Sequence, residues 1–277
     1  MSKFSIKIRT RHPSQMPLRK LLPKLDVRAM VRFGSSTPVE EVYPKFAGKR
    51  PIVEVNSIDG VKCSSNKLLM KQAFAAAEVT TSDWYTATSG TFYVGSSFVG
   101  VDISALHYPI VAKHIFGSRG TGNTMLHNKQ ELEDFIGGKD LTKYIFEKYY
   151  AYNREYRLHV TKDGCFYACR KMLKGDVPKD KRWFRNDSNS VWIVEENPQF
   201  DKPTNWDDII ADSVKALVAV GLDVAALDVR VQSAKDGDGN EIKNPKWITI
   251  ETNSAPGLGE VGLNKYVESI VKIIKSK

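Results

Sequence analysis

Ile248-Thr249-Ile250-Glu251-Thr252-Asn253-Ser254-Ala255-Pro256-Gly257-Leu258 is the most informative part of the chain, because an apolar strand ends here in a carboxylate and an amide. Residues i and i+2 of a strand project from the same face, so Glu251 and Asn253 can point at one object. Carboxylate and amide oxygens suit a hard divalent cation. We therefore interpret the pair as ligands of a magnesium ion.

The length and composition are those of a globular protein. The chain has 277 residues, of which 42% are hydrophobic, enough for a large core divided between two or three lobes. It contains no run of about 18 apolar residues, and its first residues lack the long apolar segment of a secretory signal. We therefore expect a cytoplasmic protein with no membrane partner.

Cysteine usage agrees with a reducing compartment. The three cysteines, Cys63, Cys165 and Cys169, are few and odd in number, which favours free thiols over a disulfide framework. Cys165 and Cys169 lack a second pair of ligands nearby, so their spacing argues against zinc.

Positive charge is concentrated at the start of the chain. Residues 1–50 hold 12 Lys and Arg against 3 Asp and Glu, which accounts for the whole net charge of +9. Such a segment suits an acidic or nucleic-acid partner, because a positive potential concentrates anions. A solvated lobe surface explains the same charge, since Lys and Arg are usually exposed.

The first third of the chain predicts a small mixed lobe followed by a helix. Runs with strand character occupy Phe4–Ile8, Val27–Phe33 and Pro51–Asn56, with Pro- and Gly-containing breaks between them. Capping residues then precede strong helix formers, which predicts a helix from Lys67 to about Ala77.

A strand and a glycine-rich turn follow. The apolar run from Tyr108 delivers Lys113, and the loop Gly117–Asn123 contains three glycines, which let backbone N–H groups approach phosphate oxygens. The loop lacks the Gly-Lys-Ser/Thr ending of a P-loop and the third glycine of a dinucleotide fingerprint. Taken alone, an ordinary hairpin explains it equally well.

Charged residues recur inside the later strands. Glu155 and Arg157 share a strand face, where a cross-strand ion pair is the simplest interpretation. After a helix predicted from Trp206 to Val220 by its apolar spacing, Asp228 interrupts the apolar strand 225–231. A buried carboxylate needs a cation or a hydrogen-bond donor, and the loop 233–245 brings Asp228 beside Glu251 on antiparallel strands. The alternative to a metal site here is an ion pair with Arg230 or Lys246.

The order of these parts resembles the ATP-grasp enzymes, and among them carboxylate–amine ligases such as the D-alanine–D-alanine ligases and the glutamate ligases that modify ribosomal protein tails. The resemblance covers roughly residues 52 to 275 and leaves the first 50 outside. Its most specific part is Asp228, followed 23 residues later by Glu-Thr-Asn-Ser-Ala-Pro-Gly-Leu. The matching parts are Lys67, Lys113, the loop Gly117–Asn123, Glu147–Tyr150, Glu155, Arg170, Asp228, Glu251 and Asn253.

The resemblance implies an α+β chain with the ATP-grasp fold, in which two α+β subdomains clasp ATP beside a short N-terminal α/β lobe. Residues 1–103 would form the basic lobe and a linker helix, 104–150 the small subdomain with the glycine loop, and 151–277 the large subdomain with the metal site.

The same resemblance implies a role for each matching residue. The adenine edge would bond to backbone groups between Glu147 and Tyr150, and Glu155 would bind the ribose hydroxyls. Arg170 would face the transferred phosphoryl group, with Lys171 or Arg185 as helpers. ATP would bind with two magnesium ions, for which manganese is an alternative. The implied catalytic residues are Arg170, Lys113 and Asn253; the nucleotide-binding residues are Lys67, Lys113, Gly117, Ser118, Arg119, Gly120, Thr121, Gly122, Glu147, Lys148, Tyr149, Tyr150 and Glu155; and the metal ligands are Asp228, Glu251 and Asn253.

The implied activity is an ATP-dependent ligase that joins a carboxylate to an amine through an acyl phosphate and releases ADP and phosphate. No side-chain nucleophile is required, in agreement with five histidines and three cysteines that form no recognisable triad. The alternatives are a ligase that attaches an amino acid to a nucleic acid or another macromolecule, a nucleic-acid-binding module, and a kinase that stops at the phosphorylated product. Three metal ligands argue against the binding module. The two joined substrates stay unidentified.

Overall fold

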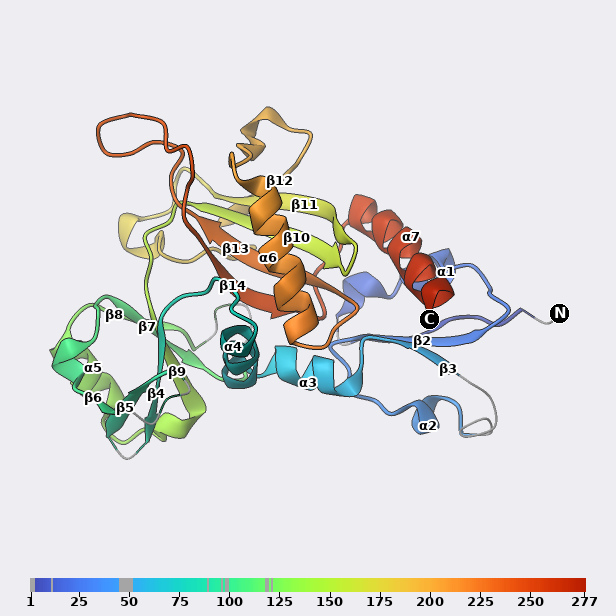
Figure 1. Ribbon diagram of the computed structural model, residues 1–277, viewed down its shortest axis with the longest axis horizontal. Helices are drawn as coiled ribbons and strands as arrows, with labels where there is room; N and C mark the ends of the chain where they lie inside the picture. Colours follow the sequence, from blue (N-terminus) through green and yellow to red (C-terminus); the bar gives the residue numbers. More distant parts are fainter. Residues whose placement is uncertain are drawn as a thin grey trace.

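The computed structural model describes residues 3–10, 12–44, 52–88, 90–95, 97, 100–117, 120 and 122–277. Their strands form a three-stranded sheet, a six-stranded sheet and a five-stranded sheet. In Figure 1 the three-stranded sheet lies on the side of the chain termini, the six-stranded sheet lies at the opposite end, and the five-stranded sheet lies between them. The predicted mixture of helices and sheets is confirmed.

The N-terminal lobe is built on a parallel sheet in the order β1-β2-β3. Its strands are β1 (Lys7–Thr10), β2 (Arg28–Phe33) and β3 (Ile52–Val55), so the first strand begins at Lys7 and not at Phe4. Helix α7 (Glu260–Ser276) packs on this sheet through Tyr266 and Ile270, and fastens the end of the chain to its beginning. The shorter helices are α1 (Leu18–Leu21), α2 (Val39–Val42) and α3 (Ile58–Ser65).

Some of the positive charge of this lobe is structural. Arg32 is completely buried, where it pairs with Glu54 and donates to the carbonyls of Thr37 and Asn56. Arg28 is also buried, with its guanidinium 4.2 Å from the ring centroid of Phe4. These two arginines support the lobe from inside, so the charge available to an acidic partner is smaller than the sequence count indicates.

The small subdomain is the six-stranded sheet, ordered β6-β5-β4-β9-β7-β8. Because β4 pairs with β9, this sheet starts at Trp84, and the structure moves the predicted start of the subdomain from residue 104 to β4. Helix α5 (Lys129–Ile136) covers it through Leu132. The strands are β4 (Trp84–Thr88), β5 (Thr91–Val94), β6 (Gly100–Val101), β7 (Ile110–His114), β8 (Thr124–Leu126) and β9 (Tyr144–Lys148).

The large subdomain is an antiparallel sheet ordered β12-β11-β10-β13-β14, with helices on one face. Figure 1 shows α6 (Trp206–Ala219) lying across this sheet, and α4 (Lys67–Ala76) packs beside it. Both predicted helices are confirmed, and the side chain of Asn66 caps α4 by accepting from the N–H groups of Leu68 and Leu69. The strands are β10 (Arg154–Thr161), β11 (Gly164–Leu173), β12 (Ser190–Val194), β13 (Val224–Val231) and β14 (Trp247–Asn253).

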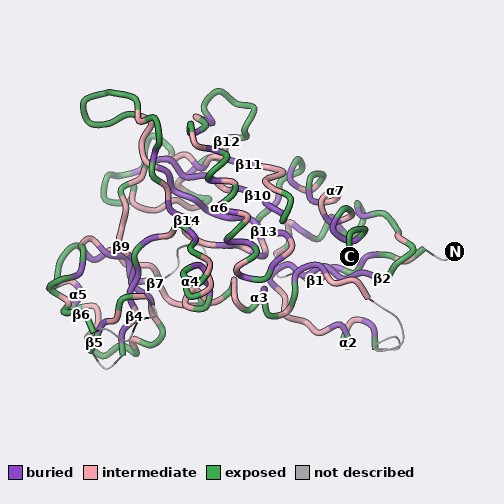
Figure 2. Tube along the Cα trace, viewed as in Figure 1, coloured by how far each residue is buried: buried purple, intermediate pink, exposed green. Residues whose placement is uncertain are grey.

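The two faces of the large sheet differ in chemistry. Tyr156 and Leu158 of β10 and Leu227 and Val229 of β13 point to the helices and are completely buried in one core. The residues between them carry charge or hydrogen-bonding groups and face the other way. Figure 2 shows how deeply these central strands are buried and how exposed the β13–β14 connection is. Among the described residues, no helix is long and apolar enough to cross a membrane.

Candidate active site

A cavity of about 550 Å³ opens on the polar face of the large sheet. Residues of all three parts of the molecule line it, including Lys113 and Glu147 of the small subdomain, Asp228 and Glu251 of the large subdomain, and His12 of the N-terminal lobe. Nearly all residues predicted from the resemblance meet here. Those lining the cavity are Lys67, Lys113, Gly117, Gly120, Glu147, Lys148, Tyr149, Tyr150, Glu155, Asp228, Glu251 and Asn253.

Strand register arranges the polar face in successive rows. In the first row Glu155 of β10 lies opposite Arg230 of β13. In the second row Arg157 lies opposite Asp228, which in turn lies opposite Glu251 of β14. The predicted neighbourhood of Asp228 and Glu251 on antiparallel strands is thereby confirmed.

A third row completes the arrangement. His159 of β10 lies opposite Ala226 of β13, which lies opposite Asn253 of β14. Each row is two residues from the next along β10, so all three rows share one sheet face. A shift of register after Asp228 sets Val229 opposite Thr249, which leaves Ile250 as the extra residue of a β-bulge.

Asp228 is held by Arg157. Nε and Nη2 of the guanidinium donate to the two carboxylate oxygens at 2.7 and 2.8 Å, a bidentate geometry. Burial would raise the pKa of Asp228, but the charge and hydrogen bonds of Arg157 hold it below its usual value. The alternative prediction, an ion pair of Asp228 with Arg230 or Lys246, named the wrong partner, because the cation comes from the neighbouring strand β10.

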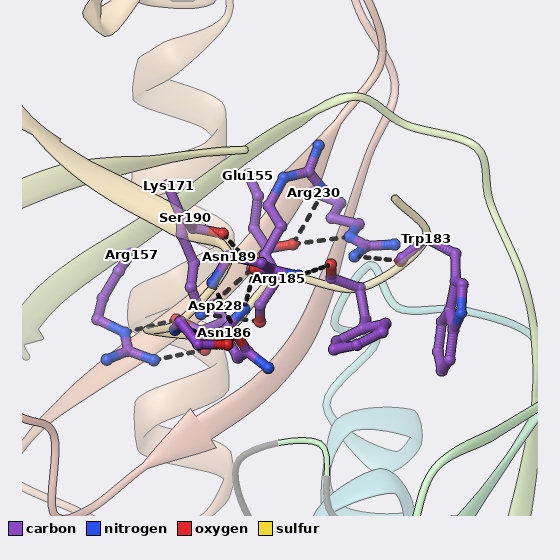
Figure 3. A network of polar contacts seen from close by, with 12 residues as sticks. Glu155, Arg157, Lys171, Trp183, Arg185, Asn186, Asn189, Ser190, Asp228 and Arg230 are labelled. Carbon is purple, nitrogen blue, oxygen red and sulfur yellow. Dashed lines mark hydrogen bonds and ion pairs between the residues drawn. The ribbon is translucent and has the colours of Figure 1, made fainter. Parts of the chain in front are cut away.

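Glu155 lies at the centre of a second, larger network (Figure 3). It accepts from Nε of Arg230 at 2.9 Å and Nη1 of Arg185 at 3.3 Å, and Nζ of Lys171 is 4.0 Å away. Glu155 thus pairs across strands with Arg230, as Arg157 does with Asp228, which is the cross-strand ion pairing expected for these two residues. Glu155 is 5% exposed and surrounded by cations. Its proposed contact with ribose hydroxyls stays a prediction.

A third carboxylate organises the small subdomain. Glu147 pairs with Lys113 at 2.9 Å and with Lys71 at 3.0 Å, and it accepts a hydrogen bond from Ser82. Burial would raise the pKa of Glu147, but the two lysines and the hydroxyl lower it to about 2. Glu147 thus fixes the ammonium group of Lys113 at the cavity wall.

Sequence reasoning missed Lys71. It lies one helical turn after Lys67, and its side chain is completely buried. Its ammonium group donates to Thr81 and Ser82 as well as pairing with Glu147. Its position in the helix could have predicted this burial, because Lys71 lies on the same side of α4 as Met70 and Phe74, which face the core.

Lys67 reaches the glycine loop. Its ammonium group donates to the carbonyl of Gly117, and burial lowers its pKa while the charge of Glu251 opposes that effect. Gly120 and Gly122 have φ of +76° and +78°, a conformation that glycine adopts without strain. Gly122 does not line the cavity. The predicted loop residues Ser118, Arg119 and Thr121 lie outside the residues that the structure describes.

Part of the segment 147–150, which was predicted to contact adenine, is already hydrogen-bonded within the fold. The N–H of Lys148 donates to the carbonyl of Asp83, and that of Tyr149 to the carbonyl of Pro109, each at 2.9 Å. These two donors are already used within the fold, so a contact with adenine, which stays a prediction, would fall to the remaining backbone groups near Tyr150. The hydroxyl of Tyr150 donates to Asp83 at 3.0 Å.

Arg170 does not line the cavity, which corrects its predicted role. Its guanidinium bonds to the carbonyl of Gln199 at 2.8 Å and pairs with Asp201 at 3.1 Å, on the helix side of the sheet. Successive residues of a strand face opposite ways, so Lys171 takes the cavity face instead. Lys171 and Arg185, the predicted helpers of Arg170, both line the cavity, and their role at a phosphoryl group stays a prediction.

The predicted metal ligands are two carboxylates and an amide. Within the described ranges no group of three or more His, Cys, Asp or Glu side chains gathers, so the predicted site depends on Asn253 or a substrate oxygen as its third ligand. Glu251 accepts no hydrogen bond from a described residue, whereas Asn253 accepts one from the N–H of Ala255 at 3.0 Å. All three groups are oxygen donors on adjacent strands, so they fit a magnesium ion. Asp228 fits on condition that it shares its oxygens with Arg157.

The N-terminal lobe supplies residues that sequence reasoning did not assign. Ser14 accepts from the N–H of Leu258 at 3.0 Å, and the buried Gln15 donates to the carbonyl of Pro256 at 2.7 Å. Nδ1 of His12 lies 2.7 Å from the hydroxyl oxygen of Ser14 and 3.3 Å from the backbone nitrogen of the same residue. This turn and the loop after Asn253 form one wall of the cavity.

Comparison with solved structures supports the fold. A D-alanine–D-alanine ligase from Bacillus anthracis complexed with ATP matches with a TM-score of 0.62 and 13% identity, over 100% of this chain and 99% of that chain. Another structure of this ligase matches with a TM-score of 0.64 and 13% identity, over 99% and 97%. The VanG D-Ala:D-Ser ligase from Enterococcus faecalis matches with a TM-score of 0.57 and 13% identity, over 92% and 75%.

The sequence comparisons are negative: no protein-family model matches the chain, and no curated protein matches it. At 13% identity a structural likeness establishes the arrangement of the chain alone. The match nevertheless extends over almost the whole of both molecules, including the N-terminal lobe that the sequence resemblance left out. The chain therefore has the ATP-grasp fold of the D-alanine–D-alanine ligases, as the resemblance predicted.

Proposed function

We propose that this protein is an ATP-dependent carboxylate–amine ligase that forms an amide bond through an acyl phosphate and releases ADP and phosphate. The observation that carries the proposal is the row of Asp228 and Glu251, with Asn253 beside it, facing a cavity that Lys67 and Lys113 also line. This arrangement combines oxygen ligands for a metal with cations for phosphates. The fold is shared with ligases, one of which was solved with ATP.

ATP would lie between the small and large subdomains. Lys67 and Lys113 would bind phosphate oxygens, and the glycine loop would cover them with backbone N–H groups. Glu147 holds Lys113 in place, because it is buried and ion-paired with that lysine. The nucleotide base would reach the strand end at Tyr150.

Asp228, Glu251 and Asn253 would hold magnesium, whose charge offsets the repulsion between the triphosphate and an incoming carboxylate. Lys171 and Arg185 line the same cavity and add positive charge near the phosphates. A preorganised set of cations stabilises the negative charge that builds up on the transferred group.

The reaction has two steps. A carboxylate oxygen of the substrate forms a bond to the γ-phosphorus while the bond from that phosphorus to the bridging oxygen breaks, and ADP leaves with the electron pair. The amine nitrogen then attacks the acyl carbon, the bond to the phosphate oxygen breaks, and the nitrogen loses a proton. Closure of the cavity would keep water from hydrolysing the acyl phosphate.

Hydroxylamine trapping tests the proposal. The protein is incubated with ATP, magnesium and pools of carboxylic acids, and ADP and hydroxamate are measured together. A ligase releases ADP and forms a hydroxamate from the correct acid, because hydroxylamine takes the acyl group from the phosphate. Release of ADP with a stable phosphorylated product and no hydroxamate would contradict the ligase and identify a kinase.

A further inference from the structure

The proposed metal ligand Asp228 has both oxygens occupied by another side chain. Arg157 donates to them at 2.7 and 2.8 Å, and the two side chains are only 14% and 11% exposed. Asp228 and Glu251 lie side by side, so without a cation their charges would repel each other. Arg157 supplies that cation, and a metal ion would have to compete with it for the same oxygens.

The surroundings of Arg157 allow it to leave Asp228. Its guanidinium carbon lies 4.8 Å from the ring centroid of Trp192, a residue that also lines the cavity. Stacking on an aromatic ring tolerates sliding, whereas a bidentate pair does not. Nη1 of Arg157 makes no hydrogen bond to a described residue. The guanidinium can therefore turn about its stem and keep the ring contact.

Other buried arginines of this sheet lack this freedom. Arg230 donates to Glu155 and also to the carbonyl of Trp183, which fixes it from two directions. Arg154 lies on β10 like Arg157 but on the opposite face, where it donates to the carbonyl of Gln232 and pairs with Asp201. Of these arginines, Arg157 alone has a carboxylate as its only hydrogen-bond partner among the described residues.

We propose that Arg157 exchanges with the metal: it neutralises Asp228 in the metal-free protein and turns to the transferred phosphoryl group when a divalent cation takes Asp228. This rests on the proposed function. The driving force is electrostatic, since a divalent cation at Asp228 repels the guanidinium and the triphosphate attracts it. Arg157 then occupies the catalytic role that the sequence assigned to Arg170.

Binding of manganese to ATP-free protein tests the exchange without any turnover. Electron paramagnetic resonance titrations at pH 8 compare wild type, Arg157→Gln and the matched control Arg154→Gln. Removal of the competing cation should tighten manganese binding by about tenfold or more in Arg157→Gln and leave it unchanged in Arg154→Gln. Circular dichroism confirms that each variant is folded, and Arg157→Lys gives an intermediate affinity because it keeps the charge with a single contact point.

Hydroxamate formation supplies the second measurement. Arg157→Gln should lower kcat about a hundredfold or more with little change in the KM for ATP, since the guanidinium acts on the transferred group. Unchanged or weaker manganese binding in Arg157→Gln would overturn the exchange, and so would an unchanged kcat. Tighter manganese binding in Arg157→Gln, with ADP release, a stable phosphorylated product and no hydroxamate from the wild type, would support the exchange at Asp228 and overturn the ligase.

Discussion

Glu155 and Asp228 are buried carboxylates in adjacent rows of one sheet face, but they are neutralised in different ways. Glu155 faces Arg230, Arg185 and Lys171, whereas Asp228 is hydrogen-bonded by Arg157 alone among the described residues. A carboxylate shared by several fixed cations is part of the framework. A carboxylate balanced by a single cation that stacks on an aromatic ring can exchange that cation for a bound ligand.

Asp228→Asn should produce the largest loss of activity. The amide keeps the shape of the side chain but loses the charge that would hold a metal, so ADP release should fall by more than about a hundredfold. Stability should fall by only about 1–3 kcal/mol, since Arg157 lies at the edge of a cavity that water can enter. Activity close to wild type in a folded Asp228→Asn protein would contradict the metal assignment; Asp238→Asn, in the exposed turn, is the control.

Glu155→Gln should lower the stability of the fold more than Asp228→Asn does. It leaves Arg230 and Arg185 without their carboxylate in a buried network, which costs about 3–5 kcal/mol. Urea denaturation of Glu155→Gln and Asp228→Asn, measured side by side, gives the comparison. If Asp228→Asn were the less stable protein, the distinction between a framework carboxylate and a ligand carboxylate would be wrong.

The pairing of Asp228 with Glu251 was predictable, and the partner of Asp228 was not. No helix or strand lies between β13 and β14 in the part of the chain that the structure describes, so the two strands pair as antiparallel neighbours and bring these residues together. Arg157 and Glu155 lie about 70 residues earlier, and only the register of β10 against β13 decides which cation meets which acid. Sequence patterns carry no information on that register.

Glu147 extends the comparison to the small subdomain and predicts a pH dependence. Its pKa is about 2 in the folded protein against an ordinary value of 4.5. A carboxyl group whose pKa is lowered by folding stabilises the fold at pH values above its pKa in the unfolded chain. About 3 kcal/mol of stability should therefore be present above pH 4.5 and be lost progressively as the pH falls towards 2. Urea midpoints of wild type should drop faster over this range than those of Glu147→Gln; parallel curves would show that Glu147 contributes nothing to the acid sensitivity.

The smallest effect is expected from Arg170→Gln, and it is informative beside Lys171→Gln. The role of Arg170 came from the resemblance, and alternation could not correct it, because both faces of the strand 165–171 mix apolar and polar residues. Arg170 lies on the helix side with Asp201, and its loss should cost about 1 kcal/mol and leave ADP release near wild type. Lys171 faces the cavity, and its loss should lower kcat/KM for ATP by at least about tenfold. Equal losses of activity in the two variants would mean that the strand face does not decide which of these cations reaches the phosphates.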